Sequence, residues 1–375
     1  MRVLVAGDFC PAYRVPAMLA TNDYSFLEAV RSYTASSDVS IVNFECTIVP
    51  NEENPIKKIG PNLSTQSQAI EALKWAGFNV FTLANNHILD YARNGLEGVL
   101  NTAGANDMHC VGAGLSKSEL SKILYVRHNN SILAVINCCE HEFSVNTLEE
   151  YGANELNPVK QYSAIREARQ KADYVMVIIH GGPEHYNLPI PRMQDTYRFF
   201  IDVGADVVIN HHQHCYSGYE EYKGKWIFYG LGNFCFDRKN APQTWKEGMM
   251  VQLIFKKNKI EFQLIPYLQA NEDNPAICIY NARQKEIFNE NIKNINAIIL
   301  DGEKLEESYM HFLQRYERLY QSYIEPYFSR VGRWLYRHHV LPSIMHSKYR
   351  LIGNVVRCES HRDRLMYALL KYFEK

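Results

Sequence analysis

The chain has 375 residues and a formal net charge of −1. This length allows one large domain with an appendage, or two domains. The near-zero charge provides no overall field that would select nucleic acid or a membrane. Nine cysteines occur without C-x-x-C spacing, and Cys138 and Cys139 are adjacent within an apolar run, which argues against a disulfide framework. We therefore expect reduced thiols in a cytoplasmic protein.

The N-terminal residues predict a strand instead of a targeting segment. The first eight residues are too short for a signal peptide, and no apolar stretch approaches the length of a transmembrane helix. The apolar run Val3–Ala6 is typical of a short buried strand. We expect Gly7 and Asp8 in the loop that follows it.

Helices and strands are predicted to alternate through the next hundred residues. Helices are expected over 24–35, 67–76 and 95–103, and strands over 40–44 and 80–83. Glu45 directly follows the first of these strands, and Asn86 and His87 closely follow the second. The polar segment 51–61 is expected to be a surface loop.

The middle of the chain continues this pattern with longer apolar runs. The predicted strands are 132–139, 173–179, 205–209 and 225–229, with helices over 161–171 and 194–203 and a hairpin of 249–255 with 260–266. Continuous apolar runs of this length are typical of strands that are buried on both faces, as in α/β sheets. We therefore predict an α/β fold.

The C-terminal part of the chain has a different character. Residues 303–323 predict a helix with one aromatic face, which we expect to pack on the main domain. From residue 331 on, Arg, Lys, His and aromatic residues are frequent. Such a segment fits a helix at an anionic membrane surface, and it equally fits a docking helix with a solvated face. We expect a main domain over 1–268 and a mainly helical extension over 269–375.

Side chains that bind metals recur where the predicted strands end. They are Asp8, Glu45, Asn86, His87, His180, His212 and His214. Because ligands bind at the carboxyl ends of strands in open α/β sheets, we expect these side chains to lie together. A single Asn-Asn-His would fit a structural turn, but the repeated placement favours a metal site. Oxygen and imidazole donors without paired thiolates suit one or two divalent ions, namely Mn, Zn, Fe or Mg.

His212 and His214 are a specific part of this pattern. In an extended segment, residues i and i+2 point the same way, so both imidazoles would reach one site. Two ions bridged by a carboxylate would generate hydroxide near neutral pH and stabilise charge on a phosphoryl group. His87 would then protonate the leaving oxygen, and Asp90 would orient the imidazole.

Six motifs in order carry a resemblance to a known family. They are Gly7-Asp8, Asn43-Phe44-Glu45, Ala84-Asn85-Asn86-His87 with Asp90, His180 to Glu184, His211 to His214, and Tyr229 to Phe234. In residues 1–268 the chain resembles the CapA family of bacterial poly-γ-glutamate capsule synthesis proteins, which is itself similar to the calcineurin-like metallophosphoesterases. The resemblance implies a four-layer α/β/β/α sandwich with a metal centre at one edge of its two sheets.

The resemblance also implies roles for individual residues. The metal ligands would be Asp8, Glu45, Asn86, His180, His212 and His214, with Glu45 in place of a bridging Asp. His87 would be the phosphate-contacting acid, with Asp90 as its partner. Residues that bind substrate or support the ligands would be Asn85, Glu184, His211 and Asn233.

The chain departs from the metallophosphoesterase pattern in its first motif, as the CapA family also tends to do. Metallophosphoesterases usually carry Asp-x-His there, and this chain has Cys10 in the position of the His. One metal position is therefore a ligand short, unless Cys10 or His141 supplies it. Glu45 is one methylene longer than Asp, and Asn210 stands where the family usually has Gly.

Two functions from different classes follow from this comparison. The first is a metal-dependent hydrolase of phosphoesters in cell-surface polysaccharide or polyglutamate capsule metabolism, acting on a phosphorylated or polymeric small substrate. The second is a non-catalytic or assembly component of capsule polymer biosynthesis. Hydrolysis of an amide in a polyglutamate-like polymer would use the same activated water. We expect no nucleic-acid partner, and the basic C-terminal segment allows peripheral contact with the inner membrane face.

Overall fold

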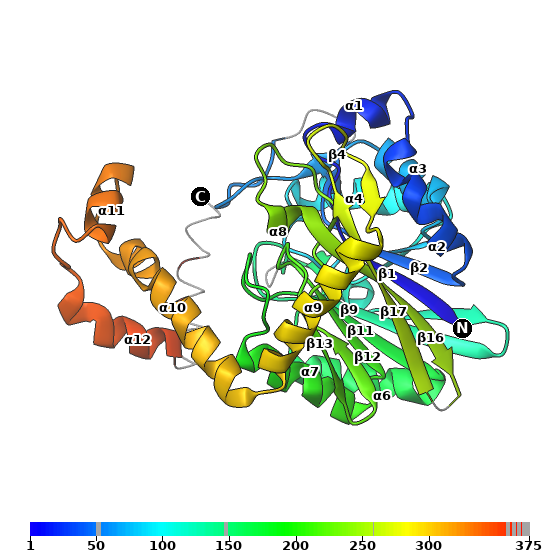
Figure 1. Ribbon diagram of the computed structural model, residues 1–375. Helices are drawn as coiled ribbons and strands as arrows, with labels where there is room; N and C mark the ends of the chain where they lie inside the picture. Colours follow the sequence, from blue (N-terminus) through cyan, green and yellow to red (C-terminus); the bar gives the residue numbers. More distant parts are fainter. Residues whose placement is uncertain are drawn as a thin grey trace. The chain divides into compact units, whose positions relative to one another are not determined.

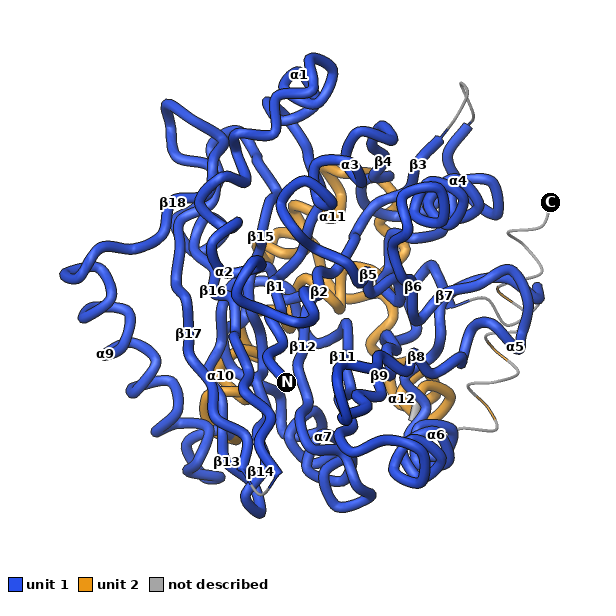
Figure 2. The backbone as a smooth tube through the Cα atoms, turned by 90° about the vertical axis from the view of Figure 1, so that its right-hand side faces the viewer, with its two compact units in different colours: residues 1–305 blue, residues 306–375 orange. Residues whose placement is uncertain are grey.

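The computed structural model describes residues 1–49, 54–145, 149–257 and 259–357, together with residues 361, 365 and 369. The chain divides into two compact units, residues 1–305 and residues 306–375 (Figure 2). Unit 1 contains both large β-sheets and all of the predicted site residues. The fold is therefore described one unit at a time.

The larger sheet of unit 1 has eight strands. Its order is β18-β17-β16-β1-β2-β5-β6, and β15 pairs with β1 beyond this path. The strands are β1 (Arg2–Phe9), β2 (Val39–Phe44), β5 (Val80–Thr82), β6 (His109–Val111), β15 (Asn233–Cys235), β16 (Glu247–Lys256), β17 (Lys259–Gln269) and β18 (Ile277–Ile279). Because β1, β2, β5 and β6 run parallel, their carboxyl ends lie at one edge.

The smaller sheet has six strands in the order β13-β14-β12-β11-β9-β8. The strands are β8 (Leu124–His128), β9 (Ser131–Cys139), β11 (Tyr174–His180), β12 (Val207–His211), β13 (Tyr219–Tyr222) and β14 (Lys225–Phe228). Strands β9, β11, β12 and β14 are parallel. This sheet therefore also delivers its strand ends to one edge.

Alternating side chains explain why the two sheets pack face to face. Val3 and Val5 of β1 share a buried cluster with Met176 and Ile178 of β11. Leu4 and Ala6 point to the opposite face, as successive residues of a strand do, and they pack in a separate cluster with residues of the covering helices. The side chains of β1 thus contribute to the apolar cluster between the sheets and to the apolar cluster under the covering helices.

Helices cover the outer faces of both sheets (Figure 1). The cluster on the larger sheet includes side chains of α1 (Val15–Ala20), η1 (Ser25–Val30), α2 (Arg31–Ala35), α3 (Gln68–Trp75) and α4 (Ala92–Ala105). Helices α6 (Pro158–Lys171) and α7 (Pro191–Val203) pack on the smaller sheet. The arrangement confirms the predicted four-layer α/β/β/α sandwich. The shorter elements are β3 (Thr47–Ile48), β4 (Ser64–Thr65), β7 (Ala113–Gly114), α5 (Lys117–Leu120), β10 (Gly152–Ala153) and α8 (Gln243–Lys246).

Unit 1 extends past the boundary predicted at residue 268. Strand β18 continues the larger sheet beside β17, and helix α9 (Ala282–Ile299) buries Phe288 and Ile292 in the cluster between the sheets. These apolar contacts hold residues 277–299 to unit 1. The sequence signal for a boundary was a change in composition, which does not reveal such packing.

Unit 2 is helical, as predicted for the C-terminal part. Its elements are α10 (Gly302–Ile324), which begins in unit 1, α11 (Arg330–Arg337), η2 (His346–Lys348) and α12 (Tyr349–Arg357). The Glu325 carboxylate, directly after α10, fixes the segment around η2. It accepts hydrogen bonds from the hydroxyls of Ser343 and Tyr349 and from the backbone N–H groups of Ile344 and Met345. Within the described part of the chain, no helix is long and apolar enough to cross a membrane.

The inter-sheet cluster should contribute strongly to the stability of unit 1. Ile178 is fully buried in it, so Ile178→Ala should lower the free energy of unfolding by roughly 2–5 kcal/mol. The matched variant Ile59→Ala, at a side chain that is 87% exposed, should change it by less than about 0.5 kcal/mol. Urea unfolding followed by near-ultraviolet circular dichroism measures both. Equal effects of the two variants would contradict the described packing.

Candidate metal centre

The strand ends of both sheets bring the predicted ligands together. Asp8 lies within β1, Glu45 follows β2, and Asn86 follows β5 after a short turn. From the smaller sheet, His180 ends β11, and His212 and His214 follow β12. All six side chains are at least nine-tenths buried. Asp8 was predicted in a loop, but β1 continues through it because it pairs with both β2 and β15.

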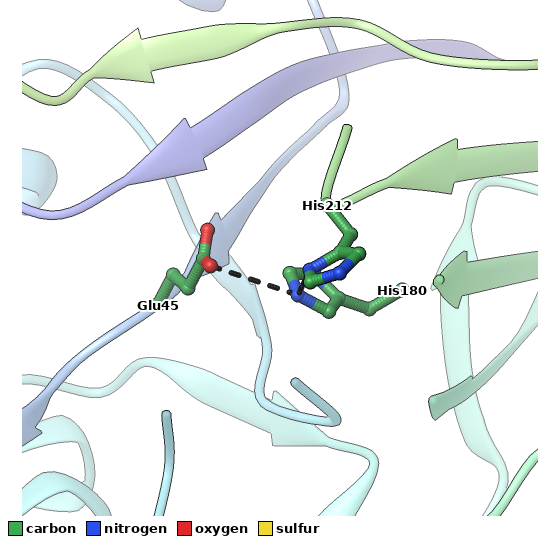
Figure 3. Close-up of side chains that lie close together, drawn as sticks. All are labelled: Glu45, His180 and His212. Carbon is green, nitrogen blue, oxygen red and sulfur yellow. Dashed lines mark hydrogen bonds and ion pairs between the residues drawn. The ribbon is translucent and has the colours of Figure 1, made fainter. Parts of the chain in front are cut away.

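The first group of donors surrounds Nε2 of His180. His212 Nδ1 lies 2.9 Å from this atom and Glu45 Oε1 lies 3.6 Å from it (Figure 3). Asn86 Oδ1 lies 3.0 Å from the same atom. Neighbouring ligands that each lie ~2.0–2.1 Å from a metal ion are about 3 Å apart. The spacing of these four donors is therefore what a shared cation requires.

A second group of donors shares Glu45 with the first. One ligand atom each from Asp8, Glu45 and His214 lies within 4.8 Å of the others. His214 Nε2 is 3.9 Å from Glu45 Oε1, and its Nδ1 is 3.6 Å from Asp8 Oδ2. Glu45 is therefore the one carboxylate that these two groups have in common.

Glu184 forms a third group with His212 and His214, again with ligand atoms within 4.8 Å of one another. Its side chain is 51% exposed, in contrast to the other donors. It comes from the loop that follows β11. From the sequence we expected Glu184 only in the surroundings of the site.

The chemistry of the donors fits a cation. Both carboxylate oxygens of Glu45 are buried without a hydrogen-bond partner among the described residues, and burial together with the charge of Asp8 raises the pKa of Glu45 well above its usual value. A buried carboxylate without a partner is costly. A cation between the donor groups would supply the missing partner.

The imidazoles are held in the form that binds metals. Burial, followed by the neighbouring His212, lowers the pKa of His180 well below its usual value. Burial likewise lowers the pKa of His214 to about 4. Burial alone would raise the pKa of Asp8, but His211, His180 and His214 outweigh it and lower that pKa below its usual range. Neutral imidazoles and ionised carboxylates are the ligand forms of these groups.

The backbone at His212 and His214 differs from the prediction. Strand β12 ends at His211, and His212 and His214 have φ angles of 91° and 54°. The expectation of an extended segment was therefore wrong, although both imidazoles reach the site. Left-handed backbone is costly for residues with a side chain and persists only where the surrounding structure enforces it.

Three side-chain amides hold the site together. Asn233 Oδ1 lies 2.9 Å from His214 Nδ1, which leaves Nε2 of His214 to face Glu45. The side-chain amide of Asn85 bonds to the backbone of Phe44 and of His87. Asn43 was part of a sequence motif but was given no role, because it lies inside a strand. Its Nδ2 donates to Asp8 Oδ1 at 2.7 Å and is 3.3 Å from His180 Nδ1.

His87 and Asp90 form the predicted pair, and a lysine joins them. His87 Nδ1 lies 2.6 Å from Asp90 Oδ2. Lys58 forms an ion pair with Asp90 and lies 3.1 Å from His87 Nδ1, and its side chain is only 2% exposed. Segment 51–61 was predicted as a surface loop, and residues 51–53 lie outside the described part of the chain. Lys58 turns inward because the buried Asp90 carboxylate needs a cationic partner.

The two other predicted sources of a metal ligand have different surroundings from the donor groups. Cys10 is buried in the apolar cluster on the outer face of the larger sheet, and its interaction with Cys46 and its burial raise the pKa of its thiol. His141 is half exposed and lies 2.7 Å from Glu155. Neither residue belongs to a group of metal-binding side chains in the described part of the chain. His211, next to the ligands, has its Nδ1 3.3 Å from Asp8 Oδ1.

Comparison with known proteins gives consistent matches. A family model described as "Bacterial capsule synthesis protein PGA_cap" matches residues 2–238. The capsule biosynthesis protein CapA of Bacillus anthracis is 31% identical over 264 residues, which cover 68% of this chain and 63% of that protein, less than two thirds of its length. The PGA biosynthesis protein CapA of Bacillus subtilis is 32% identical over 282 residues, which cover 72% of each chain.

More distant similarities extend this set. A probable polyglutamine synthesis accessory protein of Mycobacterium tuberculosis is 27% identical over 227 residues, covering 56% of this chain and 58% of that protein. Among solved structures, a putative 5'-nucleotidase from Staphylococcus aureus aligns with a TM-score of 0.46 at 13% identity, covering 77% of this chain and 57% of that one.

Replacing Glu45 should reveal the cost of its unpartnered charge. In the metal-free protein its pKa lies above the ordinary 4.5, so the folded state retains a proton that the unfolded state releases, and stability falls as the pH rises above about 4.5. Glu45→Gln replaces the titrating carboxyl group with a neutral amide. The variant should therefore be more stable than wild type at pH 8 in a chelator and less stable in Mn²⁺. Thermal unfolding across pH 4–8.5 measures both. A variant that is less stable in both conditions would assign Glu45 a structural role.

Proposed function

The chain belongs to the bacterial capsule synthesis protein family PGA_cap, and we propose that it is a metal-dependent hydrolase of phosphoesters that acts in cell-surface polymer metabolism. The observation that carries the proposal is that Glu45 belongs to two donor groups at once, with a histidine–carboxylate pair beside them. The two donor groups support binding of two divalent ions from among Mn, Zn, Fe and Mg.

The residues of the candidate site have different parts in this chemistry. Two divalent ions, when bound, would lower the pKa of a water molecule and stabilise charge on a phosphoryl group. Glu45, Asp8 and the imidazoles would hold them. Because Asp90 engages Nδ1 of His87, Nε2 of His87 is left to donate a proton to the leaving oxygen.

Lys58 supports this role of His87 through Asp90. The Asp90 carboxylate also accepts a hydrogen bond from the backbone N–H of Leu63 at 2.6 Å. Asp90 is therefore held by a buried cation and a backbone donor, and it presents a fixed acceptor to His87. Such a fixed partner sets the tautomer and the orientation of an imidazole.

The substrate class follows from the family and the relatives' names. Two relatives are named for capsule or PGA biosynthesis, so a phosphorylated or polymeric intermediate of such a polymer is the substrate we propose. The alternative is a non-catalytic assembly role, which the absence of a His at position 10 and the accessory name of the mycobacterial relative favour. Hydrolysis of an amide bond would use the same centre.

His87 provides the sharpest test of the hydrolase. His87→Ala should lower kcat on an alkyl phosphoester by roughly 10²–10⁴-fold, because a general acid contributes about this factor. The effect on an activated aryl phosphoester should be much smaller, since its leaving group needs no proton. Metal content by elemental mass spectrometry should stay at the wild-type level. A loss that is equal for both substrates, or a loss of metal, would contradict the acid role.

We further propose that unit 2 contacts an anionic membrane surface. Residues 326–357 contain six Lys or Arg residues and no Asp or Glu. Phe328 is 88% exposed, and Val331 and Trp334 of α11 are 67% and 50% exposed. Basic residues beside exposed apolar and aromatic side chains are typical of segments that lie in the membrane interface.

Vesicle binding tests this contact. The triple variant Arg330→Glu, Arg333→Glu, Arg337→Glu should bind vesicles containing 30% phosphatidylglycerol at least about 100-fold more weakly, because each basic residue near such a surface contributes about 1 kcal/mol. The control triple variant Lys117→Glu, Lys122→Glu, Arg283→Glu makes the same change in net charge at exposed positions of unit 1. Equal binding by the two variants in co-sedimentation would argue against the contact.

A further inference from the structure

The second donor group has fewer donors than the first. Around His180 four donors converge, whereas Asp8, Glu45 and His214 supply three. A fourth protein ligand is needed if this position is to hold its ion as firmly as the first. The two residues that the sequence offered for this role, Cys10 and His141, lie in the apolar cluster and in an ion pair with Glu155.

We propose that Glu184 is the missing metal ligand and makes the second position an oxygen-rich site. Its carboxylate is within 4.8 Å of ligand atoms of both His212 and His214. His212 belongs to the first donor group and His214 to the second, and Glu184, whose side chain is 51% exposed, meets the second group through His214. The inference rests on the proposed pair of metal positions and does not depend on hydrolysis.

The loop that carries Glu184 is fixed on both sides of it. On the N-terminal side, the Gly182 N–H donates to Glu140 Oε2 at 3.0 Å, and Glu140 is itself paired with Arg192 at 2.6 Å. On the C-terminal side, the His185 N–H donates to the backbone oxygen of Gln213 at 2.8 Å. The second bond ties the loop directly to the segment between His212 and His214. Glu184 is thus placed by the same segment that presents the two imidazoles.

The backbone conformation of this loop requires a glycine at position 182. Gly182 has a φ of 93°, and a Cβ at this position would lie 2.7 Å from the sulfur of Met193. Glycine permits this conformation without strain. The turn brings the chain from the buried end of β11 to a half-exposed position within two residues of Gly182. A half-exposed carboxylate remains hydrated until a cation binds, so its charge needs no buried partner in the metal-free protein.

The two positions should therefore prefer different metals. The first has two imidazoles and one amide besides the shared Glu45, a set that suits Zn²⁺ or Fe²⁺. The second would have the carboxylates of Asp8, Glu45 and Glu184 with one imidazole, a set that suits Mn²⁺ or Mg²⁺. A carboxylate from Glu184, where an imidazole would otherwise complete the second position, thus changes the metal preference of that position. The preference of the first position does not depend on Glu184.

Metal titration of the full chain tests the assignment without an activity assay. After treatment with a chelator, wild type should bind two Mn²⁺ ions by isothermal titration calorimetry. Glu184→Gln should weaken one of the two sites by more than roughly 100-fold, since even the partners of metal ligands contribute 10- to 100-fold to affinity. Electron paramagnetic resonance of the Mn²⁺-loaded variant should show an isolated ion in place of a coupled pair.

Two control variants make the result specific. Glu142→Gln removes an exposed carboxylate from the loop after β9 and should bind both ions as wild type does. Cys10→Ser should also retain both sites. Equal isotherms for Glu184→Gln and wild type, loss of a site in Cys10→Ser, or a single ion in wild type would each overturn the assignment. Two bound ions without phosphoester turnover would defeat the proposed hydrolase and leave the Glu184 assignment standing.

Discussion

A buried carboxylate at the edge of two sheets sets the constraint on which this site depends. Glu45 has no hydrogen-bond partner for either oxygen among the described residues, and it lies beside a second buried carboxylate, Asp8. Two such groups repel each other and resist burial. The imidazoles around them offer only partial compensation, because burial keeps them largely neutral. Bound cations would turn this unfavourable arrangement into a stable one.

The rest of unit 1 delivers and supports these groups. Two sheets whose parallel strands end at one edge bring residues that are up to 206 positions apart in sequence into one cluster, from Asp8 to His214. The alternating apolar residues of strands such as β1 pack in the inter-sheet cluster on one face and against the outer helices on the other. Amides of Asn43, Asn85 and Asn233 then fix the side chains that the strands supply.

The apolar runs of the sequence were sufficient for the central strands of both sheets and for the residues that directly follow them. The shorter or more polar strands β6, β8, β13, β15 and β18 were not predicted, and the four layers followed from the family resemblance. Apolar runs locate strands because burial on both faces leaves few polar positions, and Glu45 and His180 could be read from where those runs stop. The predicted bounds of the helices agreed less well with the structure than those of the central strands. Residues 24–35 were predicted as one helix, whereas η1 is a 3₁₀ turn that leads into α2.

Residues placed by loop paths could not be predicted in the same way. Lys58 looked like part of a solvated loop, yet its ammonium group is buried against Asp90. The convergence of His212 and His214 depends on left-handed backbone that strand periodicity does not encode. Glu184 could be recognised as part of a motif, but its distance from the imidazoles depends on hydrogen bonds of Gly182 and His185 to distant segments.

Turnover of a simple phosphodiester by the metal-reconstituted chain tests the central claim most directly. The full chain would be stripped with a chelator, reloaded with Mn²⁺ and mixed with bis(p-nitrophenyl) phosphate, with His212→Ala as a folded control. The account predicts that turnover is absent in the stripped protein, returns with the metal and is lost in His212→Ala. Absence of turnover in wild type that holds two ions would contradict phosphodiester hydrolysis and favour an assembly role in polymer biosynthesis.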